Sequence, residues 1–269
     1  MPIAESVRFA NAIRRTVVEE SRRANVGHIG SALSIADLIA VVFYDRIRLD
    51  GEGDRDRFIL SKGHAALALY AALHNRGRLE PGAIETYCAN GSLLGVHPEV
   101  TLEGIDFATG SLGQGLPVAV GAALAAKRQR SDRKVYVVMS DAELNEGSVW
   151  EAVMFAGHHK LDNLVVLIDL NGQQALDFTA DVIDLGDVAG KLTSFGWSAG
   201  DVPGHDHAAL NAALDADTGG RPRAIVAHTT FGHGVSFMES MIKWHYLPLD
   251  DRAYADAVGE LDAAGEVLQ

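Results

Sequence analysis

Two apolar runs separated by a segment of helix length constrain the fold of this 269-residue chain more than any other feature. Residues 134–139 and residues 163–169 each read as a strand buried on both faces, and residues 147–160 between them suit a helix. A strand, a helix and a second strand over this length form a βαβ unit, in which the strands are parallel and the crossover is right-handed. The chain is therefore expected to contain a parallel sheet with helices packed on it.

The same alternation continues on both sides of this unit. Apolar spacing predicts helices, and short apolar runs predict strands. Ser34 is expected to cap a helix that runs through Leu38 to Phe43, and Cys88 is expected to lie in the core. These patterns together predict a single α/β domain over residues 1–269, doubly wound, with a mainly parallel sheet flanked by helices. The further helices are expected at 5–24, 65–76, 81–89, 114–129, 207–216 and from Asp251, and the further strands at 58–60, 197–202 and 223–229.

Composition argues against two classes of partner. The net charge is −13, and the longest basic stretch is residues 127–130, so no basic face for nucleic acid is expected. The longest uncharged stretch, residues 107–126, is interrupted by Gly, Gln and Pro, which is not typical of a membrane span. A single cysteine and an N-terminus without an apolar run favour a cytoplasmic protein.

Polar residues follow both strands of the βαβ unit. Asp141 comes directly after the first strand and Asn171 directly after the second. Ligands of open parallel sheets bind at the carboxyl ends of strands, so these two side chains are expected to face each other. Carboxylate, carboxamide and carbonyl oxygens suit Mg²⁺ or Ca²⁺, and the helix that begins near Gly147 directs its positive end to the same place. Asp141 alone would indicate nothing, but the pair predicts a site for a metal ion and phosphate.

The segment 140–151, continued through 161–164 to 169–171, resembles the thiamine-diphosphate-binding motif, in which Gly-Asp-Gly is followed at a distance by Asn. The version in this chain resembles that of the transketolase family, and the resemblance covers nearly the whole chain. It implies the thiamine-diphosphate-binding fold, and within it the diphosphate-binding domain. Further motifs match in family order at residues 27–28, 61–64, 96–99, 109–115, 232–239 and 244–245.

The resemblance also implies roles for individual residues. Asp141, Asn171 and the main-chain carbonyl of Gln173 would hold Mg²⁺, with Ca²⁺ as a possible substitute. The catalytic group would be His28 and His97, which line the channel to the substrate, and Glu146 and Glu151, which link the two active sites of a dimer. The residues expected to bind the cofactor are His64, Gly110, Ser111, Leu112, Asp141, Ala142, Glu143, Asn171 and His245. Histidines outside the motifs are expected to be structural or exposed, namely His158, His159, His205, His207, His228 and His233.

The chain departs from the family pattern at a few positions. Ser140 and Ala142 replace the two glycines that flank the aspartate, which could affect cofactor affinity. The sequence Gly-Gln-Gln at 172–174 is unusual, and Tyr246 replaces the common Gly after Trp-His. These last differences are expected to affect the choice of substrate more than the identity of the cofactor.

The function that the resemblance implies is that of half an enzyme. Full-length relatives continue with a pyrimidine-binding domain that carries the activating glutamate, whereas this sequence stops near the end of the first domain. We therefore expect the N-terminal subunit of a two-component transketolase, which moves a two-carbon ketol unit from a ketose or ketose phosphate to an aldose. Its partner would be a separate C-terminal subunit, giving an α₂β₂ heterotetramer.

Three alternatives remain open at this point. The alpha subunit of a 2-oxo-acid dehydrogenase also binds thiamine diphosphate, but usually lacks histidines at positions like those of His28, His64 and His97. A truncated deoxyxylulose phosphate synthase has a different spacing around the first histidine. A non-catalytic scaffold that binds thiamine diphosphate is favoured only by Ser140 and Ala142.

Overall fold

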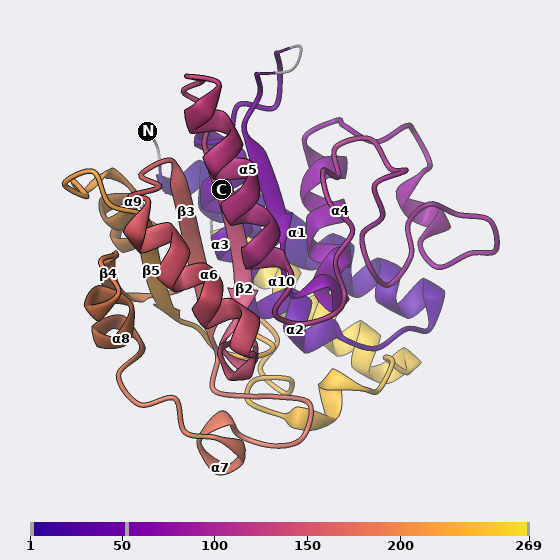
Figure 1. Cartoon of the computed structure of the whole chain (residues 1–269). Coiled ribbons are helices and arrows are strands. Elements are labelled where there is room, and N and C mark those ends of the chain that lie inside the picture. Colours follow the sequence, from indigo (N-terminus) through magenta and orange to yellow (C-terminus); the bar gives the residue numbers. More distant parts are fainter. Residues whose placement is uncertain (1–2, 52–53, 268–269) are drawn as a thin grey trace.

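The computed structural model describes residues 3–51 and 54–267, and these form one parallel sheet covered by helices (Figure 1). Every pair of neighbouring strands is parallel, in the order β1-β2-β3-β5-β4. Both strands of the expected βαβ unit are present, shifted by one residue, and the predicted doubly wound α/β class is confirmed. The strands are β1 (Arg57–Leu60), β2 (Val135–Ser140), β3 (Leu164–Leu170), β4 (Ser198–Pro203) and β5 (Arg223–His228).

Helices lie on both faces of the sheet because its central strands are apolar on both faces. In β2, Tyr136 and Val138 belong to one hydrophobic cluster, whereas Val137 and Met139 belong to the other. The first cluster includes α1 (Ile3–Ala24), α2 (Ile29–Ser34), α3 (Ala36–Asp45), α4 (Ala66–Asn75), α9 (His207–Asp215) and α10 (Asp251–Val267). The second includes α5 (Gly115–Arg128), α6 (Gly147–His158) and α8 (Val188–Ser194). Short helical turns complete the chain: α7 (Thr179–Val182), η1 (Gly63–Ala65), η2 (Ile84–Thr86), η3 (Asp141–Asn145) and η4 (Ile242–His245).

The structure corrects three local expectations. Ser34 does not cap the following helix: it is the last residue of α2, and its hydroxyl donates to the carbonyl of Ser31 and to Asp169. The helix expected at 81–89 is reduced to η2, because Gly82 and Cys88 adopt positive φ angles of 78° and 57°, which a helix cannot accommodate. Cys88 is only half-buried and packs at the edge of the core.

No helix within residues 3–51 and 54–267 combines the length and the apolar character that a membrane crossing requires.

Gly157 marks the closest approach between α6 and the chain that enters β4. A Cβ atom there would lie 1.9 Å from the carbonyl oxygen of Phe195, whereas a Cβ at Gly259 in α10 would have no neighbour within 4 Å. Gly157→Ala is therefore expected to lower the free energy of unfolding by about 1–3 kcal/mol through overpacking. Gly259→Ala is expected to raise it by up to about 1 kcal/mol, because alanine favours a helix. Urea denaturation of the two variants measures both, and equal midpoints would contradict the close contact.

Candidate functional site

A cavity of about 260 Å³ lies at the carboxyl edge of the sheet and collects most of the residues that the sequence singled out. It is formed where β2 and β3 end, together with the loops that follow α1, β1 and β5. A larger hollow of about 580 Å³, lined by residues between 78 and 103, contains none of the predicted site residues. The residues lining the smaller cavity are His28, Ser31, Lys62, His64, His97, Gly110, Leu112, Ser140, Ala142, Asn171, Gln173, Gln174, Ala175 and His245.

Three imidazoles are packed against one another on one wall of this cavity. The ring centroids of His28, His64 and His245 lie 5.1–5.5 Å apart. Burial lowers the pKa of His64 well below its usual value and the pKa of His245 to about 4, and it also lowers the pKa of His28. Neighbouring imidazoles and the Lys62 ammonium act in the same direction. At neutral pH these rings are therefore uncharged, and each offers one donor and one acceptor to a ligand.

A left-handed backbone turn brings His28 to this wall. His28 has a φ angle of 63°, and its N–H donates to the carbonyl of His245 at 3.2 Å. Gly27 must be glycine here, because a Cβ would lie 2.4 Å from the carbonyl oxygen of Tyr246. The Gly-His pair noted in the sequence thus joins the end of α1 to η4.

Asp141 lies between the ends of β2 and β3 with no water contact. Its exposed fraction is 0%, and its carboxylate accepts hydrogen bonds from the N–H of Gly172 at 2.9 Å and from Thr179 at 3.1 Å. Burial and the nearby Asp169 raise the pKa of Asp141 to about 6. A buried carboxylate whose bonded partners are neutral is a favourable place for a cation.

Asn171 is oriented by the same cluster. Its Nδ2 donates to Asp169 Oδ2 at 2.8 Å, which fixes the amide so that Oδ1 is on the other side, where it accepts the N–H of Gln173 at 2.9 Å. Asp169 is itself held by Lys62 at 2.5 Å and by Ser34 at 2.9 Å. A carboxylate, an oriented carboxamide oxygen and a main-chain carbonyl form a hard oxygen donor set, so these residues fit Mg²⁺.

Glu143 does not face the cavity, although the sequence suggested a contact with the cofactor. Its side chain is 0% exposed, and its carboxylate accepts hydrogen bonds from Ser61, from the N–H of Gly113 at 3.1 Å and from the N–H of Ser140 at 2.9 Å. Three separate cavity-lining loops therefore meet on one carboxylate. The side chain of Ser140 is accommodated beside it, since the Ser140 hydroxyl lies 3.4 Å from the Glu143 carboxylate.

The remaining predicted residues lie outside the cavity. Ser111, Glu146 and Glu151 are exposed in the chain and are absent from the lining, so the cavity alone gives them no role. The sequence reading missed Ser31, Lys62, Gln174 and Ala175 as lining residues. Lys62 lies inside a motif that was recognised, but nothing in the sequence indicated that its ammonium would pair with Asp169.

Fold and site together define a class of protein: a doubly wound α/β domain with a cavity for an anionic, metal-bound ligand at the carboxyl ends of its strands. Residues 5–261 match the family described as "Transketolase, thiamine diphosphate binding domain". The chain belongs to this family.

Relatives of two lengths are similar to the chain. It is 38% identical to one of the named subunits of the apulose-4-phosphate transketolase of Phocaeicola vulgatus, over 95% of its own length and 93% of that protein. It is 36% identical to a 6-deoxy-6-sulfo-D-fructose transketolase subunit of a Clostridium species, with 95% and 96% covered. The crystal structure of Campylobacter jejuni transketolase superposes with a TM-score of 0.88 at 29% identity, and the chain covers 46% of it. The chain thus matches named subunits end to end, and less than half of the long transketolase.

Proposed function

We propose that the chain is the N-terminal subunit of a two-component transketolase-like enzyme, which moves a two-carbon ketol unit from a ketose or ketose phosphate to an aldose acceptor. The observation that carries the proposal is the single cavity in which neutral histidines lie beside the oriented oxygens of the Asp141–Asn171 cluster. The relatives that match along their whole length are named as transketolase subunits, which supports the same conclusion.

Each part of the cavity has a task in this proposal. Thiamine diphosphate supplies the electron sink when bound. Asp141, Asn171 and the Gln173 carbonyl hold Mg²⁺, for which Ca²⁺ can substitute, and the cation neutralises the diphosphate. Gly110, Leu112 and Ala142 approach the cofactor through their backbone, as does Ser111 beside them.

The histidines divide into two pairs. His64 and His245 bind near the diphosphate. His28 and His97 lie along the channel, where a neutral imidazole polarises the carbonyl of the sugar and holds its hydroxyls by hydrogen bonds.

A second polypeptide completes the site in this proposal. It carries the pyrimidine-binding domain, and the two chains assemble as a heterotetramer with two copies of each. Glu146 and Glu151, exposed at the start of α6, act across that assembly. We further propose that residues 1–269 act as one domain and that the pair works in the cytoplasm, which suits a chain with one cysteine.

Reconstitution tests the proposal. The chain is titrated with thiamine diphosphate, with and without Mg²⁺, first alone and then co-expressed with a candidate pyrimidine-domain chain. We expect tight, Mg²⁺-dependent binding and cleavage of a ketose only in the complex, since neither chain alone holds both ends of the cofactor. Ketoses and 2-oxo acids are compared as donors.

The possible results separate the alternatives. Full turnover by this chain alone would rule out the two-component arrangement. Cleavage of 2-oxo acids in place of ketoses would favour the alpha subunit of a 2-oxo-acid dehydrogenase. A complex that forms without binding the cofactor would favour the scaffold, with Ser140 and Ala142 as the reason.

A further inference from the structure

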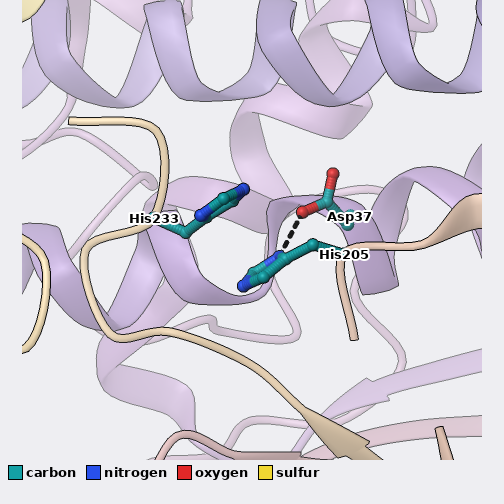
Figure 2. A group of neighbouring side chains, drawn as sticks. All are labelled: Asp37, His205 and His233. Carbon is teal, nitrogen blue, oxygen red and sulfur yellow. Dashed lines mark hydrogen bonds and ion pairs between the residues drawn. The ribbon is translucent and has the colours of Figure 1, made fainter. Parts of the chain in front are cut away.

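A group of charged and imidazole side chains lies outside the cavity, on the layer formed by α1 and α3. Asp37 of α3, His205 of the loop before α9 and His233 of the loop after β5 point toward one another (Figure 2). The imidazoles of His205 and His233 are stacked, with ring centroids 3.6 Å apart and an angle of 18° between the planes. Their ligand atoms are close enough to surround a metal ion, lying within 4.8 Å of one another.

The hydrogen bonds of His205 do not leave it free to bind a metal. His205 Nδ1 lies 2.6 Å from Asp37 Oδ2, and His205 Nε2 accepts the backbone N–H of Thr230 at 2.8 Å. Since Nε2 is the acceptor, Nδ1 carries the proton and donates it to Asp37. The same Oδ2 atom of Asp37 also accepts from the guanidinium of Arg14. Both ring nitrogens are thus in use, and the cluster is better explained as a support for the backbone.

Asp37 is a rigid anchor for this support. Its side chain is 5% exposed and that of Arg14 is 7% exposed, and a third donor, His207, lies 3.0 Å from Asp37 Oδ1. Burial alone would raise the pKa of Asp37, but Arg14, His205 and His207 hold that pKa well below its usual range. The carboxylate is therefore charged and fully bonded, and it holds the ring of His205 in one orientation.

The backbone that His205 holds leads directly to the cavity. Phe231 follows Thr230, is 1% exposed, and lies parallel to the imidazole of His245, with 6.0 Å between ring centroids and 13° between planes. The other side of Phe231 fits against Gly30, where a Cβ would lie 2.1 Å from the phenylalanine ring. The position of Thr230 thus determines where Phe231 packs, and Phe231 in turn supports one face of His245.

We propose that Asp37 and His205 are positioning residues, which hold Thr230 so that Phe231 orients His245 in the cavity. The consequence for catalysis depends on the function proposed above, whereas the effect on the backbone does not. Neither residue touches the cavity, so both act only through the chain between Thr230 and His245. This assigns a purpose to a histidine that the sequence places outside the recognised motifs.

Two substitutions of His205 separate its hydrogen bonds from its volume. His205→Phe keeps a ring to stack on His233 but removes both hydrogen bonds. His205→Gln keeps a donor for Asp37 and an acceptor for Thr230 but loses the ring. If the hydrogen bonds position the backbone, the glutamine variant should behave as the parent and the phenylalanine variant should not.

The backbone effect is read by ¹⁹F NMR of the full chain labelled with 5-fluorotryptophan. Trp244 lies next to His245, whereas Trp150 and Trp197 pack with the opposite layer and serve as internal controls. We expect His205→Phe to shift the Trp244 resonance alone, and His205→Gln to shift none. An unchanged Trp244 in the phenylalanine variant, or equal shifts in both variants, would overturn the proposal. Should His205→Phe fail to fold, Asp37→Asn is measured in its place, with the same expectation for Trp244.

The catalytic effect is read in the reconstituted two-chain enzyme. His205→Phe is expected to lower kcat/KM about tenfold, which is typical when the partner that orients a functional histidine is removed. The loss should disappear when His245 is already alanine, because coupled residues are not additive. Equal losses in both backgrounds would show that His205 does not act through His245. Inactivity of the parent pair would overturn the proposed function and leave the NMR result standing.

Discussion

Replacing Asp141 with asparagine is expected to abolish Mg²⁺-dependent binding of thiamine diphosphate and to lower ketol transfer by about 100- to 1000-fold. The change keeps the size of the side chain and removes its charge. Because Asp141 is completely buried and its bonded partners are neutral, the uncharged variant should be at least as stable as the parent without ligand. Loss of function and retained stability should therefore occur together.

Isothermal titration with thiamine diphosphate, at fixed Mg²⁺ and in its absence, measures the first effect, and urea denaturation measures the second. Asp217→Asn is the matched control, because it makes the same chemical change at an exposed position before β5 begins. Parental affinity in the Asp141→Asn complex would show that the metal is held elsewhere. A large loss of stability would show that the carboxylate has a structural role.

Asp169→Asn is expected to give the largest loss of stability, about 3–5 kcal/mol in the free energy of unfolding. The side chain of Lys62 is 1% exposed, and its ammonium pairs with Asp169 at 2.5 Å. Without that carboxylate a buried cation is left uncompensated. Lys62→Met should cost less, because Asp169 retains the hydrogen bonds that Ser34, Asn171 and Thr229 donate.

Urea denaturation of both single variants and of the double variant measures this asymmetry. The double variant should be more stable than Asp169→Asn alone, since it no longer buries an unpaired ammonium. If the losses of the single variants simply add, the pair does not contribute as a pair. The Gly259→Ala chain, altered far from this pair in sequence, sets the scale for a change in a helix.

The strands and the metal cluster could be predicted because their signals are local. An apolar run followed at once by Asp141 or Asn171 places both side chains at the same edge of a parallel sheet, whatever the rest of the chain does. The turns at Gly82 and Cys88 were missed because helical spacing of apolar residues does not reveal a positive φ angle.

The contacts that support the site could not be predicted, because they join distant parts of the sequence. Asp37 and His205 are 168 residues apart, and neither belongs to a pattern that indicates the other. Glu143 was found for the right region but with the wrong direction, since only the packing shows that its carboxylate points away from the cavity. Lys62 and Asp169 were likewise visible as residues and invisible as a pair.

The carboxylate of Glu143 has a practical consequence for anyone who recombines this protein with its relatives. The loops at Ser61, Gly113 and Ser140 each contribute to the cavity, and all three donate to that one buried side chain. A chimera that exchanges one loop without the others leaves a buried charge short of a donor, so cavity loops in this domain should be transplanted as a set.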